Sequence, residues 1–148
     1  LKEKAFGCFE HINLVPDNRY MHGFTDRVSI PVSRWSEIKY RDLEKYTNLE
    51  VLLSSDQTGP CLIDDKNHNA VYMINHLEYD TLTLKSEYLR DRSLSAQTTI
   101  PENYFPNNDI SKTPVNYWRS HGHLLYGNWI NEIYQTTPYD KSNIGKTE

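Results

Sequence analysis

The sequence has few cysteines, no long apolar run and no cluster of basic residues. Two cysteines among 148 residues do not establish a disulfide framework from sequence. No apolar run approaches the roughly 18 residues that a membrane-spanning helix needs, so no bilayer span is expected. The net charge is -4 and Lys and Arg are dispersed, which argues against nucleic acid or an anionic membrane surface as a partner.

Neither cysteine has the sequence neighbours of a catalytic nucleophile. Cys8 lies in an apolar segment typical of a strand, and Cys61 follows the turn-like residues 55–60. A nucleophile of the elbow type sits on a strand-to-helix turn, which neither segment resembles. We therefore expect two ordinary reduced thiols, with Cys8 the nearer of the two to the expected active site.

The length and composition predict one domain with a modest core. A chain of 148 residues buries roughly two-thirds of its unfolded surface, but only 37% of the residues are hydrophobic. Some apolar faces are therefore expected to need a partner. The chain begins at Leu1 rather than Met, which suggests a fragment or a processed product, and a fragment would hide any signal peptide.

Apolar runs and turn compositions predict the secondary structure. We expect strands over residues 6–11, 49–53, 60–63 and 70–74, and helices over 36–46, from Asp80 or Thr81 to about Arg90, and over 118–134. The last three strands would form a meander, with His76 at the end of the third, and Ser36 would cap the first helix. Residues 93–117 are polar and Pro-bearing and predict an ordered loop. Leu82, Tyr88 and Leu89 are expected to face the sheet, and Trp118, Leu125, Trp129 and Ile133 are spaced for one buried stripe.

His76 and Glu78 are the most informative residues of the chain. They stand two positions apart at the end of an apolar run, and side chains at i and i+2 of a strand share one face. An imidazole beside a carboxylate is the supporting pair of a nucleophilic site. The nucleophile itself is not evident in this chain.

The surrounding sequence resembles the homoserine O-acyltransferases, the succinyl- and acetyltransferases of methionine biosynthesis that are related to class I glutamine amidotransferases. The similarity runs through Lys4 to His11, Phe24 to Arg34, Tyr46 to Leu52, Asn103 to Asp109, Trp118 to Gly122 and Gln135 to Asp140. Several long strings in the right order make this a specific resemblance. It implies that residues 1–148 are the C-terminal portion of a single α/β acyltransferase domain, part of a flavodoxin-like three-layer fold.

The sequence departs from the family pattern in two ways. The family usually reads Gly-His-Pro-Glu-Tyr-Asp, whereas Asn75 and Leu77 replace the Gly and the Pro here. Loss of a flexible Gly and a stiff Pro could shift the imidazole. The chain also covers only the second half of such an enzyme, and the acyl-carrying cysteine belongs to the first half, so we expect the isolated chain to be inactive.

The resemblance implies a role for each member of the pair. His76 would act as the base in two steps, in which an acyl group passes from acyl-CoA to the cysteine and then to the acceptor hydroxyl. Glu78 would hold the imidazole tautomer and stabilise the imidazolium. Without the resemblance, a histidine satisfied at a strand end and a surface or capping carboxylate are the simpler interpretations.

Three further residues match acceptor-binding positions of the family. Arg90 would pair with the substrate carboxylate, although an arginine can also complement its own helix C-terminus. Lys4 and Ser33 would contact the substrate or the acyl-enzyme, although a lysine near a chain start is usually solvated and a serine before Arg34 usually serves a turn or a cap.

The remaining expectations concern cofactors and partners. His121 and His123 lie about 200° apart around a helix axis, so they do not suggest a metal site. The resemblance implies acyl-CoA as a co-substrate without a bound cofactor, L-homoserine as the acceptor, and a cytoplasmic enzyme that is a homodimer at full length. A serine O-acetyltransferase of the same family and a non-catalytic relative that binds an amino acid or a partner remain as alternatives.

Overall fold

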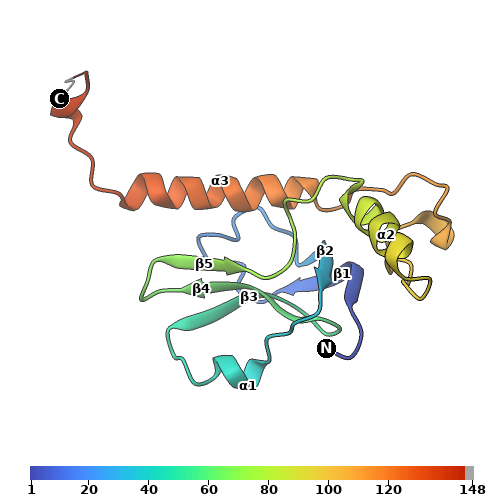
Figure 1. Ribbon diagram of the computed structural model, residues 1–148. Coiled ribbons are helices and arrows are strands. Elements are labelled where there is room, and N and C mark those ends of the chain that lie inside the picture. Colours follow the sequence, from blue (N-terminus) through green and yellow to red (C-terminus); the bar gives the residue numbers. More distant parts are fainter. Residues whose placement is uncertain (146–148) are drawn as a thin grey trace.

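The computed structural model describes residues 1–145 as a mixed α/β fold (Figure 1). The strands are β1 (Ala5–Asn13), β2 (Arg27–Arg34), β3 (Leu49–Ser55), β4 (Gly59–Asp65) and β5 (Ala70–Met73). The helices are α1 (Tyr40–Leu43), α2 (Thr83–Leu94) and α3 (Arg119–Thr136), with short 3-10 turns η1 (Pro106–Asn108) and η2 (Lys141–Asn143).

The five strands form one curled antiparallel sheet with the order β2-β1-β3-β4-β5. The predicted meander is confirmed as β3-β4-β5. Strand β2 was not predicted, because Pro31 interrupts the hydrogen-bonding pattern expected of a strand. Proline is tolerated on edge strands, and β2 lies at the edge of this sheet.

The curl of the sheet brings its two edges close to each other. The chain leaves β5 at one edge, and the backbone N–H of His76 then donates to the carbonyl of Pro31 on β2, the opposite edge, at 2.9 Å. Within residues 1–145, the strands pair only in the antiparallel sense, and a single parallel bridge joins Gly7 to Glu102. The parallel strands of a flavodoxin-like three-layer domain therefore remain a prediction that residues 1–145 do not test.

The first two helices differ from their predicted bounds. Instead of a helix over 36–46 capped by Ser36, only α1 forms, and it buries none of its residues. None of residues 36–46 is buried, so tertiary packing does not stabilise a longer helix there. Helix α2 begins at Thr83 and extends to Leu94, and it buries Leu84 and Tyr88. The predicted burial of Tyr88 is confirmed. The predictions that Leu82 and Leu89 face the sheet are wrong, because both side chains are about half exposed.

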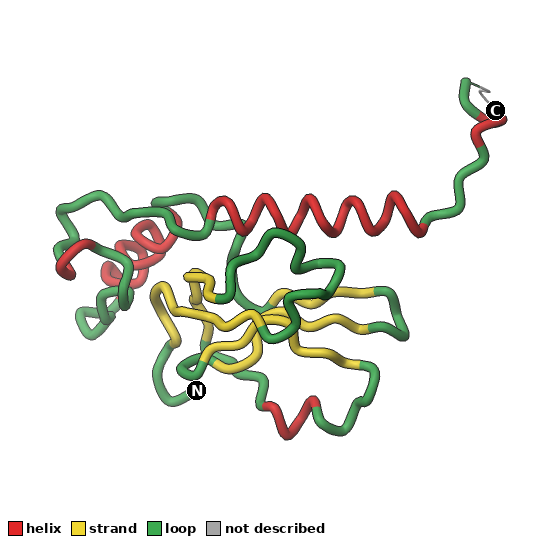
Figure 2. The backbone as a smooth tube through the Cα atoms, turned by 180° about the vertical axis from the view of Figure 1, so that it is seen from behind, coloured by secondary structure: helices red, strands yellow, loops and turns green. Residues whose placement is uncertain are grey.

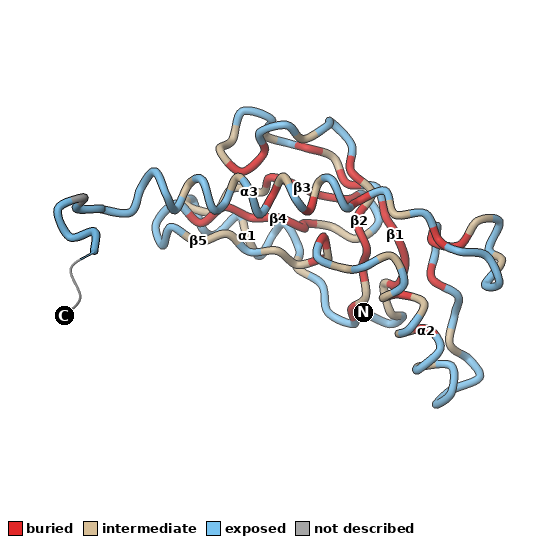
Figure 3. Tube along the Cα trace, turned by 90° about the horizontal axis from the view of Figure 1, so that it is seen from above, coloured by how far each residue is buried: buried red, intermediate tan, exposed pale blue. Residues whose placement is uncertain are grey.

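Helix α3 lies along the sheet in both side views (Figures 1 and 2). The predicted stripe is confirmed for Trp118 and Leu125, which are buried, but Trp129 and Ile133 are 40% and 43% exposed. Figure 3 shows the same change from buried to exposed along α3. A groove of about 400 Å³ opens between the β4–β5 hairpin and α3 at Leu125 and Trp129, so the helix does not close onto the sheet there.

Both cysteines are free and buried in the core. Burial raises the pKa of the Cys8 and Cys61 thiols to about 12, so each remains neutral near pH 7. The prediction of two ordinary reduced thiols is confirmed. Among residues 1–145, no helix is long and apolar enough to cross a membrane.

His11 is a fully buried imidazole on β1, and it predicts a pH dependence of stability. Burial lowers its pKa from about 6.5 to about 4. The unfolded chain takes up a proton below about pH 6.5 while the folded chain does not, so stability falls as the pH drops from 6.5 to 4, by at most about 3 kcal/mol. We expect His11→Gln to flatten this part of the profile of Tm against pH. Parallel profiles for the two proteins would contradict the assignment.

Candidate active site

The His76–Glu78 pair is formed by a turn after β5. The Nδ1 atom of His76 lies 2.7 Å from Oε1 of Glu78. The prediction that His76 ends the strand is wrong, because β5 stops at Met73 and the pair meets across a tight bend rather than along one strand face. Donation from Nδ1–H to the carboxylate leaves the lone pair on Nε2, the arrangement of a general base.

Tyr79 fixes the plane of the His76 ring. The ring stacks on Tyr79 with centroids 4.1 Å apart and an interplanar angle of 13°. The backbone of Tyr79 is held in turn by Trp118, whose Nε1–H donates to the Tyr79 carbonyl at 2.7 Å. The side chains of His76 and Glu78 are 29% and 47% exposed, so the pair is accessible from one side.

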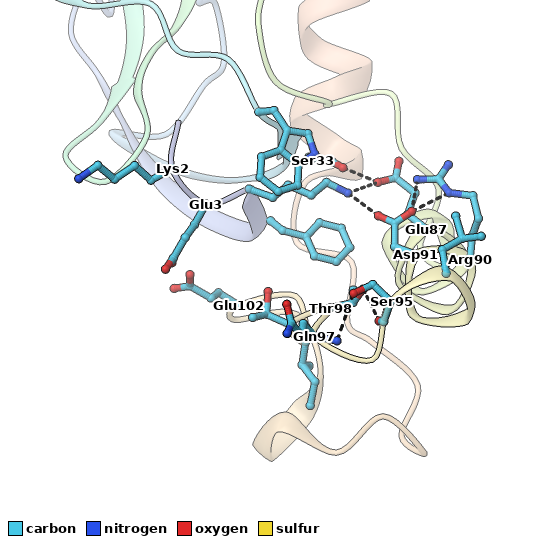
Figure 4. A pocket seen from close by; sticks show the side chains of 16 residues that line it. Lys2, Glu3, Ser33, Glu87, Arg90, Asp91, Ser95, Gln97, Thr98 and Glu102 are labelled. Carbon is cyan, nitrogen blue, oxygen red and sulfur yellow. Dashed lines mark hydrogen bonds and ion pairs between the residues drawn. The ribbon is translucent and has the colours of Figure 1, made fainter.

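Lys4, Ser33 and Arg90 line one pocket of about 1000 Å³ (Figure 4). They come from three separate segments, the residues before β1, strand β2 and helix α2. Among the residues predicted from sequence, the structure therefore brings these three together. His76 and Glu78 do not line this pocket.

Glu87 connects this pocket with the turn that carries His76 and Glu78. It accepts hydrogen bonds from the Ser33 hydroxyl and from the Tyr79 hydroxyl, the latter at 2.6 Å, and Lys4 Nζ lies 3.7 Å away. Burial and the Glu87 carboxylate raise the pKa of Tyr79, which keeps its hydroxyl a donor at neutral pH. Because Tyr79 also stacks on His76, one chain of contacts runs from the imidazole to the pocket.

Asp91 completes the charged wall of the pocket. It accepts from Lys4 Nζ at 2.9 Å, and Arg90 Nη2 lies 2.7 Å from its other oxygen (Figure 4). The hydrogen bonds from Lys4 and then Arg90 lower the pKa of Asp91, and the bond to Asp91 raises the pKa of Arg90. The charged wall thus consists of the cations Lys4 and Arg90 and the carboxylates Glu87 and Asp91.

Sequence reasoning missed Glu87, Asp91 and Tyr79. Glu87 lies three residues before Arg90 on a helix, and residues at that spacing share a face. The spacing alone could have placed Glu87 beside the predicted Arg90. The contacts of Asp91 with Lys4 and of Tyr79 with Glu87 depend on how α2 packs, which no local pattern reports.

The other histidines that could suggest a metal site have ordinary surroundings. His121 lies on α3 with Nε2 3.0 Å from the Thr25 hydroxyl, and its ring contacts Phe24. In the part of the chain that the structure describes, no group of three or more His, Cys, Asp or Glu side chains could hold a metal ion.

The fold and the site define a mixed α/β protein with a histidine–carboxylate pair linked to a charged pocket. A family model for homoserine O-succinyltransferase matches residues 1–139, and the chain belongs to this family. Homoserine O-acetyltransferases from Cereibacter sphaeroides and Roseobacter denitrificans are 53% and 54% identical to it over 146 residues. These matches cover 99% of this chain and 48% of each relative, so the chain spans about half the length of the curated relatives it matches.

One solved structure supports the fold at much lower sequence similarity. The crystal structure of SMU.1228c superposes with a TM-score of 0.54 at 15% identity, covering 89% of this chain and 53% of that one. The curled antiparallel sheet with its helices is therefore an arrangement also found in a solved protein.

Proposed function

We propose that the parent protein transfers an acyl group from acyl-CoA to the hydroxyl of L-homoserine through a cysteine thioester. This chain supplies the base, His76, and its supporting carboxylate, Glu78. The observation that carries the proposal is the convergence of Lys4, Ser33 and Arg90 on one pocket linked to His76. The resemblance in sequence assigned a shared task to these residues, and separate segments of the fold place them side by side.

The pair can act as the base in both steps. In the first step, His76 takes the proton of the cysteine thiol as the sulfur attacks the acyl-CoA carbonyl, and the proton passes to the departing CoA thiolate. In the second step, His76 takes the proton of the acceptor hydroxyl as its oxygen attacks the thioester, and the cysteine leaves as a thiol carrying that proton. Glu78, 2.7 Å from Nδ1, stabilises the imidazolium in each step.

The charged wall of the pocket suits a zwitterionic amino acid. Arg90 can bind the substrate carboxylate with its planar fork of donors, and its side chain is 63% exposed. Glu87 and Asp91 lie on the same wall and can attract the substrate ammonium group. A wall with balanced charges favours a zwitterion over a simple anion or cation.

The names of the relatives favour acetyl-CoA as the donor, since the proteins that are 53% and 54% identical are homoserine O-acetyltransferases. The family model is named for the succinyl reaction, so both donors belong in the test. We also propose that the parent is a cytoplasmic homodimer without a bound cofactor, and that this chain forms part of a three-layer flavodoxin-like domain.

The test is acyl transfer by the full-length parent from acetyl-CoA and succinyl-CoA to L-homoserine and L-serine. We expect transfer to homoserine, with acetyl-CoA the better donor. Preference for serine would replace the acceptor and retain the mechanism. Absence of transfer for all four pairs would contradict the proposal and favour a non-catalytic relative.

Replacing Glu87 by Gln tests the contribution of its charge to amino-acid binding in the pocket. Gln keeps the size of Glu87 but loses the charge that faces Lys4 and the two hydroxyl donors. Loss of charge-assisted bonds costs about 1.5–3 kcal/mol, so we expect KM for the amino acid to rise roughly tenfold or more while KM for acyl-CoA stays unchanged.

The matched control for Glu87→Gln is Glu3→Gln. Glu3 lines the same pocket but points away from the cluster formed by Glu87 and Asp91 (Figure 4). The control should leave both KM values near wild type. Equal effects of the two substitutions would show that only the net charge of the pocket matters.

A further inference from the structure

Asn75 precedes His76 and is almost fully buried, with 2% of its surface exposed. Its side-chain amide lies between two charged or titratable groups from different strands. Arg34 on β2 donates from Nε to Oδ1 of Asn75 at 3.0 Å, and Nδ2 of Asn75 lies 2.9 Å from Nε2 of His11 on β1.

The surrounding hydrogen bonds determine the direction of each contact. Nδ1 of His11 lies 2.9 Å from the carbonyl of Phe9, so Nδ1 carries the hydrogen and Nε2 is an acceptor. The Asn75 amide group therefore donates to His11, and its oxygen accepts from Arg34. Burial lowers the pKa of His11 to about 4, which keeps the imidazole neutral as this arrangement requires.

Arg34 is itself held at its far end. Its two terminal nitrogens donate to the carbonyls of Ser36 and Thr58. Three ionisable groups surround the Asn75 side chain. They are His11, Arg34 and Cys61, whose thiol is neutral and hydrogen-bonds to Asn75. Every polar group of the Asn75 side chain has a partner, which is the condition under which a buried polar network rigidifies a structure.

Residues 75 and 76 are anchored to the same edge strand at two points. The His76 N–H binds the Pro31 carbonyl, and the Asn75 side chain binds Arg34 three residues further along β2. Ser33, which lines the pocket, lies between these two anchors. The turn that carries His76 and Glu78 is therefore attached directly to β2, the strand that contributes Ser33 to the pocket.

We propose that Asn75 is a positioning residue, whose amide ties the His76–Glu78 turn to β1 and β2 and fixes the imidazole relative to the pocket. The proposal rests on the proposed function. A glycine at this position would have no side chain to make these contacts. A simple filling role for Asn75 makes a different prediction, because a similarly sized apolar residue would then serve equally well.

The test compares Asn75→Leu and Asn75→Asp in the full-length protein. Leu keeps the approximate size but makes none of the bonds, and misplacement of a base by about 1 Å can cost up to roughly 10²-fold in rate. We expect kcat for Asn75→Leu to fall on the order of 10- to 100-fold, with KM for homoserine nearly unchanged.

Asn75→Asp is expected to restore part of the activity that Asn75→Leu loses. The carboxylate can accept from Arg34 and also from His11, provided that Nε2 of His11 takes up a proton. We expect a kcat well above that of Asn75→Leu and a His11 that is doubly protonated near pH 7. Nitrogen-15 NMR of the imidazoles reports this state directly. Asn13→Leu is the control. It removes a buried amide from the same strand, two residues after His11, and the oxygen of that amide accepts from the Val15 N–H instead. This variant should keep kcat within about twofold of wild type.

The outcomes separate the proposal from the proposed function. Wild-type kcat in a folded Asn75→Leu, or equal losses in the Leu and Asp variants, would overturn the positioning role. If the wild-type parent transfers no acyl group, the proposed function fails. The nitrogen-15 chemical shifts of the His76 imidazole then test the positioning role by themselves. A wild-type Nδ1–H tautomer that becomes mixed in Asn75→Leu supports the positioning role, and identical shifts in the two proteins contradict it.

Discussion

His76→Ala in the full-length parent is expected to lower kcat for acyl transfer by about 10²- to 10⁴-fold, the usual contribution of a positioned general base. The expectation follows from the geometry of the turn, in which Glu78 fixes the tautomer and Tyr79 fixes the plane of the ring. Both steps of the proposed reaction use the same imidazole. Its removal should therefore affect acylation of the protein as well as release to the acceptor.

The matched control is His123→Ala, which removes an exposed imidazole from α3. Steady-state kinetics of the two variants, with thermal unfolding to verify their folding, give the comparison. We expect the control to behave as wild type. A kcat for His76→Ala within about threefold of wild type would exclude His76 as the base, since such a change is far below the general-base contribution.

Gly7→Ala is expected to cause the largest loss of stability among single substitutions of a small residue. Gly7 adopts φ +150°, which L side chains rarely adopt, and an added Cβ would overlap the backbone of Glu102. This close approach lets the Cys8 N–H donate to the Glu102 carbonyl at 2.8 Å and the Glu102 N–H donate to Phe6 at 2.9 Å. The contact holds the loop that forms one wall of the pocket against β1.

The expected cost of Gly7→Ala is about 3 kcal/mol or more, from backbone strain together with the broken bridge. Thermal unfolding of the full-length protein should show Tm lower by roughly 5 °C or more. Gly127→Ala is the control, because a Cβ there meets nothing within 4 Å and the residue lies within α3. We expect that substitution to be neutral or to stabilise by up to about 1 kcal/mol. An unchanged Tm for Gly7→Ala would contradict the described contact.

Strands and helices with a clear apolar pattern in the local sequence were predicted correctly. The three apolar runs separated by turn residues correspond to β3, β4 and β5, and the apolar spacing after residue 117 corresponds to α3. Strand β2 escaped prediction because Pro31 is acceptable only on an edge, and edge position is a property of the whole sheet. The exposed end of the α3 stripe has a similar cause, since spacing identifies an apolar face but not the surface that covers it.

The candidate site was predictable in its residue types and less so in its connections. The resemblance pointed to His76, Glu78, Lys4, Ser33 and Arg90. The structure shows the last three around one pocket and the first two in a neighbouring turn, while their roles remain predictions. The contacts through Glu87 and Asn75 join segments far apart in sequence, and such pairings arise only from the folded arrangement.

The most direct test of the central claim is intact-mass spectrometry of the full-length parent mixed with acetyl-CoA in the absence of an acceptor. The account predicts that wild type gains one acetyl group, that L-homoserine then removes it as O-acetylhomoserine, and that His76→Ala gains none on the same timescale. If acceptor is acetylated with no acetylated protein at any time, or if His76→Ala is acetylated as fast as wild type, the cysteine-thioester mechanism with His76 as its base is wrong.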